Sequence, residues 1–245
     1  MRNLLLPLLS LLLVLPCSAK TKSDSLAVKS NFKAGELIMP LSLVGVGSLG
    51  FVEPIKTWHH GLQGNLSKGE GESVIKADEY LRFVPMVGIY GASLLGAEAK
   101  HGYIDRTLEL GVSFVALTTI GYGCKYMIHS PRPNGSDNKS FPSGHTATAF
   151  MGAELVRIEY GEDYPWLAAG AYTIATAVGA LRVYNDCHWF NDVIAGAGVG
   201  ILSARIGYWL LPYTRRLAHR VTGWDVFLSP MASTEGAALN AVVKF

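Results

Sequence analysis

The sequence predicts an all-α fold: a six-helix bundle with its functional site at one end and a short β-hairpin-like tail at the C-terminus. Composition is the first reason, because 49% of the 245 residues are hydrophobic and only 16% are charged, against ~25% charged residues in an ordinary soluble domain. Six apolar segments of helical length are the second reason. The length suits one domain, and the net charge of +2 argues against nucleic-acid binding. A membrane protein or an unusually apolar helical protein is therefore expected.

Residues 1–19 are typical of a signal peptide. Arg2 supplies the positive charge, an apolar run covers 4–15, and small residues occupy the cleavage-specifying positions at the end. The run is shorter than the ~20 residues that a membrane span needs, so a first transmembrane helix is the weaker interpretation. Lipidation of Cys17 is another alternative, which Pro16 directly before it disfavours.

Residues 20–34 are polar and are expected to form a loose segment before the helical domain 35–223. The predicted helices cover residues 36–52, 78–97, 106–129, 144–160, 165–184 and 188–211. Asp78 and Pro165 stand at helix starts, where a first-turn acid and a proline are favoured. Many glycines within these segments suit close packing between helices. The long segment 53–76 is expected to be a loop that acts as a lid or binds substrate.

Whether these helices span a bilayer is open at the level of sequence. Their uncharged cores mostly run about 15–17 residues, below the ~20 of a membrane span. Glu154 and Arg205 lie inside two of them and would have to face the interior of a spanning bundle. A cleaved signal peptide would also place the end of the third helix, and the motifs after it, in the cytoplasm. A compact helical domain in the periplasm, resting on or partly in a membrane, avoids that conflict.

The tail 224–245 differs in pattern from the rest of the chain. Two stretches of alternating residues flank the turn-forming residues 234–236, which is typical of a hairpin. A hairpin alone cannot form a membrane-spanning β-barrel, because two strands cannot close one. The tail is therefore interpreted as a small appendage.

Two cysteines, Cys124 and Cys187, remain after the signal peptide is removed. Export would permit a disulfide between them. Two cysteines do not establish a disulfide framework, however, and small buried hydrophobic residues are the favoured interpretation.

Lys125 and Arg132 form the first cluster that can carry chemistry. Lys125 stands near the end of the predicted helix 106–129, and Arg132 follows in the loop. The planar guanidinium of Arg132 can hold two phosphate oxygens, while Lys125 adds a point charge. An isolated pair of this kind would indicate only a solvated helix end.

The string Pro142-Ser143-Gly144-His145 forms the second cluster, at the start of a predicted helix. Helix N-termini offer free N–H groups and the positive end of the helix dipole, so they bind anions such as phosphate. Gly144 lets the backbone approach an oxygen closely, Ser143 can cap the helix or bond the anion, and His145 lies in the first turn. Taken alone, a plain N-cap and a structural histidine are the alternatives.

Arg182, His188 and Asp192 form the third cluster. His188 and Asp192 are four residues apart and therefore share one helix face. Asp192 can accept the N–H of His188, which fixes the tautomer and leaves the other ring nitrogen free to attack. Arg182 would complete a cationic cradle. An ordinary His–Asp pair on a helix surface is the alternative interpretation of this cluster alone.

The three clusters together are expected by chance in on the order of one chain in a million of this length. At these residues the sequence resembles the type-2 phosphatidic-acid phosphatase superfamily, which includes membrane lipid phosphatases, soluble bacterial acid phosphatases and vanadium haloperoxidases. The resemblance runs from Lys125 to Asp192. One position departs from the family pattern, because Leu181 stands where the family usually has a serine before the arginine.

The resemblance implies a metal-independent phosphatase. His188 would attack phosphorus, Asp192 would stabilise the resulting cation, and His145 would protonate the leaving oxygen and then activate water. No carboxylate–histidine cluster in the sequence resembles a metal site, and no cofactor is expected. The phosphoryl oxygens would be bound by Lys125, Arg132, Ser143, the N–H of Gly144, and Arg182.

The implied substrate is a phosphate monoester or pyrophosphate, and the apolar helices favour a lipid. Lipid A, undecaprenyl pyrophosphate and phosphatidylglycerol phosphate are the candidates. The alternatives are a soluble periplasmic acid phosphatase, a vanadium haloperoxidase and a non-catalytic phosphate-binding membrane protein. The expected location is periplasmic, on or in a membrane, and the sequence does not indicate an oligomeric state.

Overall fold

The computed structural model describes residues 32–67, 75–222, 225–233 and 236–244. The predicted signal peptide 1–19 and all but the end of the predicted loose segment 20–34 lie outside the described residues.

The described part of the chain is a helical domain, as predicted, but it contains eight α-helices rather than six. In chain order the elements are η1 (Ala34–Leu37), α2 (Ile38–Ser48), η2 (Leu49–Phe51), α3 (Ile55–Leu66), α4 (Asp78–Leu81), α5 (Val84–Leu94), α6 (Tyr103–Ile128), α7 (Gly144–Tyr160), α8 (Pro165–Tyr184), α9 (Phe190–Thr222), β1 (Asp225–Ser233) and β2 (Gly236–Lys244).

Two of the differences from the predicted helices have local causes. The predicted helix 78–97 is split into α4 and α5, because Pro85 occupies the first turn of α5, where its missing N–H is not needed. The predicted loop 53–76 contains α3, which long-range hydrogen bonds hold in place: the Gln63 amide donates to the Val183 carbonyl at 2.9 Å.

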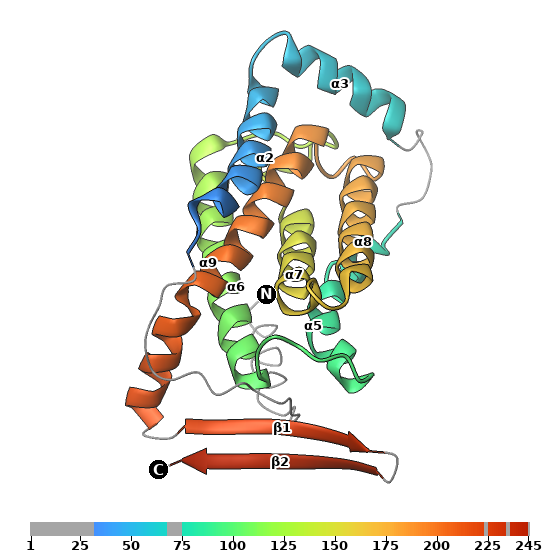
Figure 1. Ribbon diagram of the computed structural model, residues 1–245. Coiled ribbons are helices and arrows are strands. Elements are labelled where there is room, and N and C mark those ends of the chain that lie inside the picture. Colours follow the sequence, from blue (N-terminus) through green and yellow to red (C-terminus); the bar gives the residue numbers. More distant parts are fainter. Residues whose placement is uncertain (1–31, 68–74, 223–224, 234–235, 245) are drawn as a thin grey trace.

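Helix α7 forms the centre of the bundle and contacts α9, α8, α5 and α6 (Figure 1). Glycines allow the closest of these approaches. A Cβ at Gly200 of α9 would lie 2.3 Å from the Ala147 carbonyl oxygen, and one at Gly152 would lie 2.8 Å from the Met86 backbone nitrogen. The predicted role of glycine in helix packing is thus confirmed at Gly200, and Gly152 is a further case.

Four helical stretches of the described residues are long and apolar enough to cross a membrane: Ala34–Phe51, Tyr103–Ile128, Pro165–Tyr184 and Phe190–Arg220. The two charged residues inside predicted helices do face the interior. Glu154 is 1% exposed and Arg205 is 8% exposed, and the Arg205 Nε atom lies 2.5 Å from Glu154 Oε1. This pairing meets the condition that charged residues inside a spanning bundle face its interior.

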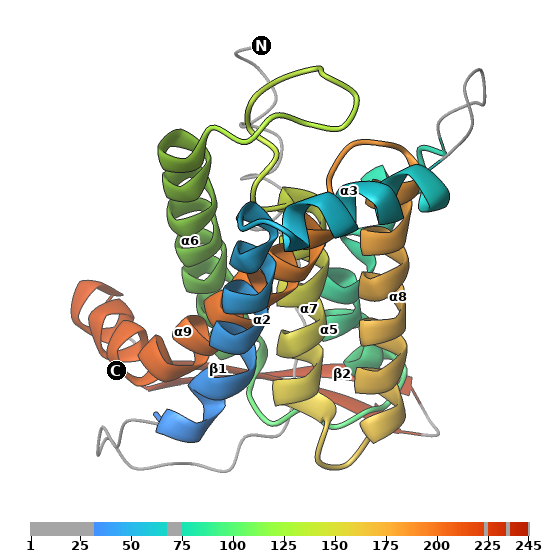
Figure 2. The same cartoon turned by 90° about the horizontal axis from the view of Figure 1, so that it is seen from above.

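The two ends of the bundle carry different structures. Helix α3 lies across one end, and β1 and β2 lie at the other (Figure 1). The strands pair antiparallel, from Asp225 opposite Lys244 to Ser233 opposite Gly236. Figure 2 shows the long connection 129–143 running from the end of α6 to the start of α7.

Candidate active site

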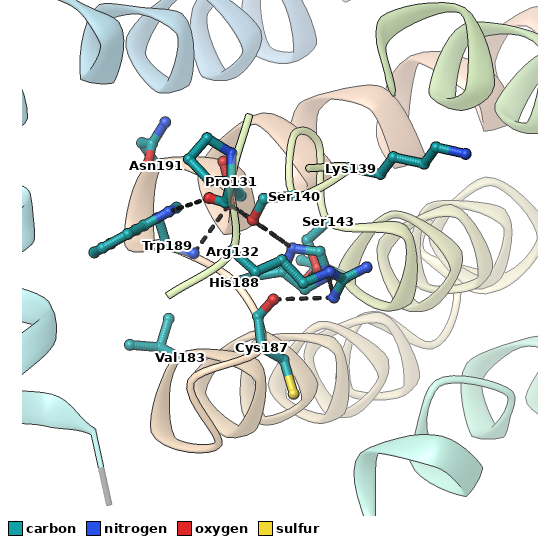
Figure 3. Close-up of polar contacts among 12 residues, drawn as sticks. Pro131, Arg132, Lys139, Ser140, Ser143, Val183, Cys187, His188, Trp189 and Asn191 are labelled. Carbon is teal, nitrogen blue, oxygen red and sulfur yellow. Dashed lines mark hydrogen bonds and ion pairs between the residues drawn. The ribbon is translucent and has the colours of Figure 1, made fainter. Parts of the chain in front are cut away.

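The predicted site residues come from three helix junctions that meet at one end of the bundle. The first junction joins α6 to α7, the second lies at the start of α7, and the third joins α8 to α9. The Ser143 backbone N–H donates to the Asp192 carbonyl at 3.0 Å, which joins the second junction to the third. Arg132 lies against His188, which joins the first to the third (Figure 3).

His188 lies in the loop before α9 and is 2% exposed. Its Nε2 atom is 3.2 Å from the Arg132 NH1 atom. A guanidinium only donates hydrogen bonds, so Nε2 is the acceptor and the ring proton resides on Nδ1. Burial lowers the pKa of His188 to about 4, and the positive charges of Arg132 and Arg182 act in the same direction. The ring is therefore neutral near pH 7, with a lone pair on Nε2.

The predicted contact between His188 and Asp192 is indirect in the structure. His188 Nδ1 and Asp192 Oδ2 are 3.7 Å apart, too far for a direct hydrogen bond. Ser140 lies between them: its Oγ atom is 3.3 Å from His188 Nδ1 and donates a short hydrogen bond to Asp192 Oδ2. The Trp189 backbone N–H donates to the same carboxylate oxygen at 3.0 Å. Asp192 thus holds the His188 ring in part through Ser140, which is fully buried.

Ser140 was not predicted as a site residue, because one serine in a polar loop belongs to no motif and no periodic pattern. Replacing it with alanine removes the hydroxyl between His188 and Asp192, so we expect kcat to fall about 10-fold with little change in KM. The measurement is steady-state phosphate release. Ser136→Ala, in the exposed part of the same loop, is the matched control and is expected to keep full activity. Equal activity of the two variants would show that Ser140 does not orient the ring.

Arg132 is held in place on both sides of its side chain. Its Nε atom donates to Asp137 Oδ1 at 2.9 Å, and its backbone N–H donates to the Asp137 carbonyl at 3.0 Å. Its NH1 atom also donates to the Cys187 carbonyl at 3.0 Å (Figure 3). These bonds fix the guanidinium beside His188 before any ligand binds.

Arg182 ends α8 and faces two acidic residues that the sequence did not mark as part of the site. Its NH1 atom donates to Asp78 Oδ2 at 2.6 Å and lies 3.9 Å from Glu79 Oε1. Asp78, predicted as a helix-start residue, is 1% exposed. Arg182 therefore reaches the site as one half of a buried ion pair with Asp78.

His145 lies in the first turn of α7, and its Nε2 atom is 3.1 Å from Glu79 Oε2. Burial lowers the pKa of His145 to about 4, Arg182 lowers it further, and the contact with Glu79 opposes both effects. His145 is therefore neutral near pH 7 in the empty site. A phosphate dianion placed beside it would favour the imidazolium.

The fold brings together two carboxylate–histidine groups that the sequence does not show. Asp78, Glu79 and His145 offer ligand atoms within 4.8 Å of one another, and His101, Glu109 and Glu159 form a second such group. Neither group is visible in the sequence, because its members come from separate segments. In the first group the Asp78 carboxylate is already neutralised by Arg182.

Ser143 and Gly144 begin α7 as predicted, but they play different parts. The Ser143 side chain makes no capping bond; its hydroxyl bonds the Thr146 hydroxyl at 2.9 Å and is fully buried. Both its hydroxyl and its backbone N–H, which donates to the Asp192 carbonyl, are engaged within the protein, so the N–H groups open to an anion at this helix start are those of Gly144 and the residues after it. A Cβ at Gly144 would meet nothing within 4 Å, so there is open space above this turn.

Lys125 lies at the edge of the site. Its Nζ atom donates to the Lys139 carbonyl at 2.6 Å, and it lies within electrostatic range of Arg132 and Asp192. Of the two cysteines, Cys124 precedes Lys125 and Cys187 precedes His188, and both are free thiols.

Helix α3 packs onto the loop that carries His188. The His60 ring stacks on Trp189 with centroids 3.8 Å apart, and Gln63 donates to Asp186 Oδ1 at 2.9 Å. The segment predicted as a lid thus contributes a helix beside the site. Trp58 of the same helix is 62% exposed.

Residues 106–216 match the family model of the PAP2 superfamily, and this range includes every residue from Lys125 to Asp192. This segment of the chain belongs to that superfamily. The family predicted from the three clusters is thus confirmed.

Two curated PAP2 relatives match parts of the chain. The lipid A 1-phosphatase of Porphyromonas gingivalis is 36% identical over 146 residues, which are 58% of this chain and 32% of that protein. The bacitracin transport permease protein BcrC of Bacillus licheniformis is 36% identical over 76 residues, 31% of this chain and 35% of that protein. The matched regions thus span about a third of the length of each relative.

Two solved structures are similar to this chain. LpxE of Aquifex aeolicus has a TM-score of 0.44 and 21% identity, covering 60% of this chain and 92% of that one. The transmembrane PAP2-type phosphatidylglycerolphosphate phosphatase of Bacillus subtilis has a TM-score of 0.45 and 16% identity, covering 73% of this chain and 96% of that one.

Proposed function

We propose that this protein is a membrane-embedded, metal-independent phosphatase that hydrolyses a lipid phosphate monoester or pyrophosphate through a phospho-histidine intermediate on His188. The observation that carries the proposal is the buried His188 ring, 2% exposed, whose Nε2 atom lies 3.2 Å from the Arg132 guanidinium. A neutral nucleophile beside a fixed cation suits attack on an anionic phosphoryl group.

Binding comes first in the proposed cycle. The phosphoryl oxygens would lie among Arg132, Arg182 and Lys125, with the open backbone turn at Gly144 supplying N–H donors. These groups neutralise the charge that spreads over the transferring phosphoryl group, which is the main catalytic task in phosphoryl transfer.

Covalent transfer follows. His188 Nε2 forms a bond to phosphorus as the bond to the leaving oxygen breaks, and His145 gives its proton to that oxygen. The proton on His188 Nδ1 remains directed at Ser140 and Asp192, which stabilise the cationic phospho-imidazole. Neutral His145 then removes a proton from water, and the resulting hydroxide attacks phosphorus and releases phosphate from His188.

A lipid substrate is supported by three features. Four described helices suit a membrane, α3 exposes Trp58 beside the site, and one relative is a lipid A 1-phosphatase. Amphiphilic substrates reach a site at a membrane surface by lateral diffusion, and exposed aromatic side chains favour that interface.

The test of substrate class is phosphate release in EDTA and detergent from lipid A carrying a 1-phosphate, undecaprenyl pyrophosphate, phosphatidylglycerol phosphate and p-nitrophenyl phosphate. We expect kcat/KM for at least one of the lipids to exceed that for the soluble ester at least about 10²-fold, because remote binding energy raises the rate. Equal values for all four would favour the soluble acid phosphatase. Halide oxidation with added vanadate and no phosphate release would favour a haloperoxidase.

The pH dependence of the rate is expected to be bell-shaped. His188 must be neutral, so the rate falls as the pH drops through its pKa of about 4. His145 must be protonated, so the rate falls on the alkaline side as His145 in the substrate complex loses its proton. Because burial lowers the pKa of free His145 to about 4, the optimum of kcat/KM is expected at acidic pH, with the kcat optimum higher.

Glu79 allows a test of the role of His145 as the general acid. Its contact with His145 raises the pKa of that histidine, so Glu79→Gln is expected to move the alkaline limb of kcat to lower pH. Glu98→Gln removes the same charge from an exposed position elsewhere and is expected to leave the profile unchanged. Identical profiles for wild type and Glu79→Gln would contradict the role of His145.

A further inference from the structure

A second cluster of ionisable residues lies at the end of α7 opposite the candidate active site. Glu159 is 15 residues beyond Gly144 along α7, which places it about 22 Å away at 1.5 Å per residue. It meets His101, from the connection between α5 and α6, and Glu109 of α6. The proposed phosphatase mechanism uses none of the three.

The geometry of the cluster is that of a small cation site. His101 Nδ1 lies 2.6 Å from Glu159 Oε1, and the His101 backbone N–H donates to Glu159 Oε2 at 2.9 Å. One ligand atom from each of the three residues lies within 4.8 Å of the other two. Two ligands about 2.1 Å from one metal ion are at most about 4.2 Å apart, so small side-chain movements suffice to enclose an ion.

Glu109 is the residue that points to a ligand. It is 1% exposed, and no N–H group of the residues that the structure describes donates to either of its carboxylate oxygens, whose polar neighbour is the Glu159 carboxylate. A buried carboxylate without a partner costs several kcal/mol unless a cation or a proton compensates it. Glu109 also lies in the second turn of a helix suited to a membrane, where an ionisable residue marks a functional site.

The two neighbouring cations act on the cluster by their charge, but their hydrogen bonds go to other groups. Arg106 donates through NH1 to Tyr160, Ser93 and the Ile89 carbonyl, and Lys100 Nζ donates to the Tyr208 hydroxyl at 3.0 Å. Neither bonds the Glu109 carboxylate. Two carboxylates and the buried Arg106 guanidinium therefore meet in one region, so Arg106 offsets part of the negative charge, and a bound cation or a proton shared by the two carboxylates would offset the rest.

We propose that His101, Glu109 and Glu159 bind one divalent transition-metal cation of the zinc class, in a structural site separate from the active site. One imidazole nitrogen with two carboxylates suits zinc, whereas calcium and magnesium prefer oxygen ligands alone. The His101 side chain is 15% exposed and gives the ion a route from solvent. The bound ion would tie the α5–α6 connection to α6 and α7.

The test is metal content. Full-length protein is purified in detergent without a histidine tag, stripped with chelator, incubated with Zn²⁺, separated from free ion and measured by mass spectrometry of the metal. We expect about one Zn²⁺ per chain and a Tm that rises with Zn²⁺. Glu109→Gln and His101→Ala are each expected to lower the content at least about 10-fold, because each removes one of three ligands.

Two controls make the result specific. Glu98→Gln, exposed on the same connection, is expected to keep the ion. His145→Ala removes the histidine from the group of Asp78, Glu79 and His145 in the active site. This variant is also expected to keep the zinc ion. Zinc content near zero in folded wild type, or content unchanged by Glu109→Gln, would overturn the proposal and indicate a proton shared by the two carboxylates. Loss of zinc only in His145→Ala would also overturn it, because the ion would then sit in the active site.

Discussion

Replacing His188 with alanine is expected to lower kcat for phosphate release by at least about 10³-fold, because no other group can form the covalent intermediate. The ring is 2% exposed and fixed between Arg132 and Ser140. Alanine at position 188 leaves no nucleophilic atom at that place. The measurement is phosphate release in EDTA from the preferred lipid. The binding affinity for inorganic phosphate is expected to change far less, because the cationic cradle remains.

A matched histidine exists for this experiment. His129 is exposed and adopts a positive φ of 45°, a conformation that asparagine accepts, so His129→Asn tests the loss of a histidine without strain. It is expected to keep wild-type kcat. A His188→Ala protein that retains more than about a tenth of wild-type kcat would contradict nucleophilic catalysis by this residue.

Replacing Arg132 with alanine is expected to lower kcat about 10²–10³-fold, the usual cost of one donor to the transferring group. The Arg132 NH1 atom lies 3.2 Å from the attacking nitrogen. Lysine at this position is expected to recover only a small part of the loss, because an ammonium lacks the planar fork that can hold two phosphoryl oxygens once the guanidinium has released the attacking nitrogen. The measurement is kcat and KM for both variants.

The control for Arg132 is an arginine that also forms an ion pair. Arg215 pairs with Asp105 at 2.5 Å, and its side chain is 43% exposed. Such a pair contributes at most about 1 kcal/mol of stability, so Arg215→Ala is expected to keep kcat. Full activity of Arg132→Lys would show that a point charge suffices at this position. It would contradict the claim that the planar guanidinium is needed.

Local signals were strong enough to place some helices from sequence. The helices at 144–160 and 165–184 have the predicted bounds, because Ser143-Gly144 and Pro165 mark their starts and a long apolar pattern follows. Helix α9 was predicted to end at residue 211, but it continues to Thr222 through Pro212. A proline inside a helix is rare, and only the tertiary structure can show that it is tolerated.

Helix α3 could not be predicted because its stability comes from other parts of the chain. Its sequence contains Gly61 and Gly64, which weaken an isolated helix. The contacts that hold it are distant: Gln63 reaches residues 120 or more positions away in sequence. A local pattern carries no information about such partners.

The site was predictable where a motif was present and not elsewhere. All eight predicted residues gather at one end of the bundle, because each lies at or near a helix end. Ser140, Asp78 and Glu79 were missed, since a buried partner is recognised by its position in space and not by its spacing. The same limit applies to Asp192. Its four-residue spacing from His188 predicted a direct hydrogen bond, but in the structure the Ser140 hydroxyl lies between the two side chains.

The most direct test of the central claim is detection of phosphate on His188. Wild-type protein is mixed with substrate labelled in the phosphoryl group, quenched within the first turnover in alkali, digested and analysed by mass spectrometry. The proposed mechanism predicts an acid-labile phosphate on the peptide that contains His188, on Nε2, and no label in His188→Ala. Turnover without label on any histidine, or label on His145 instead, would contradict it.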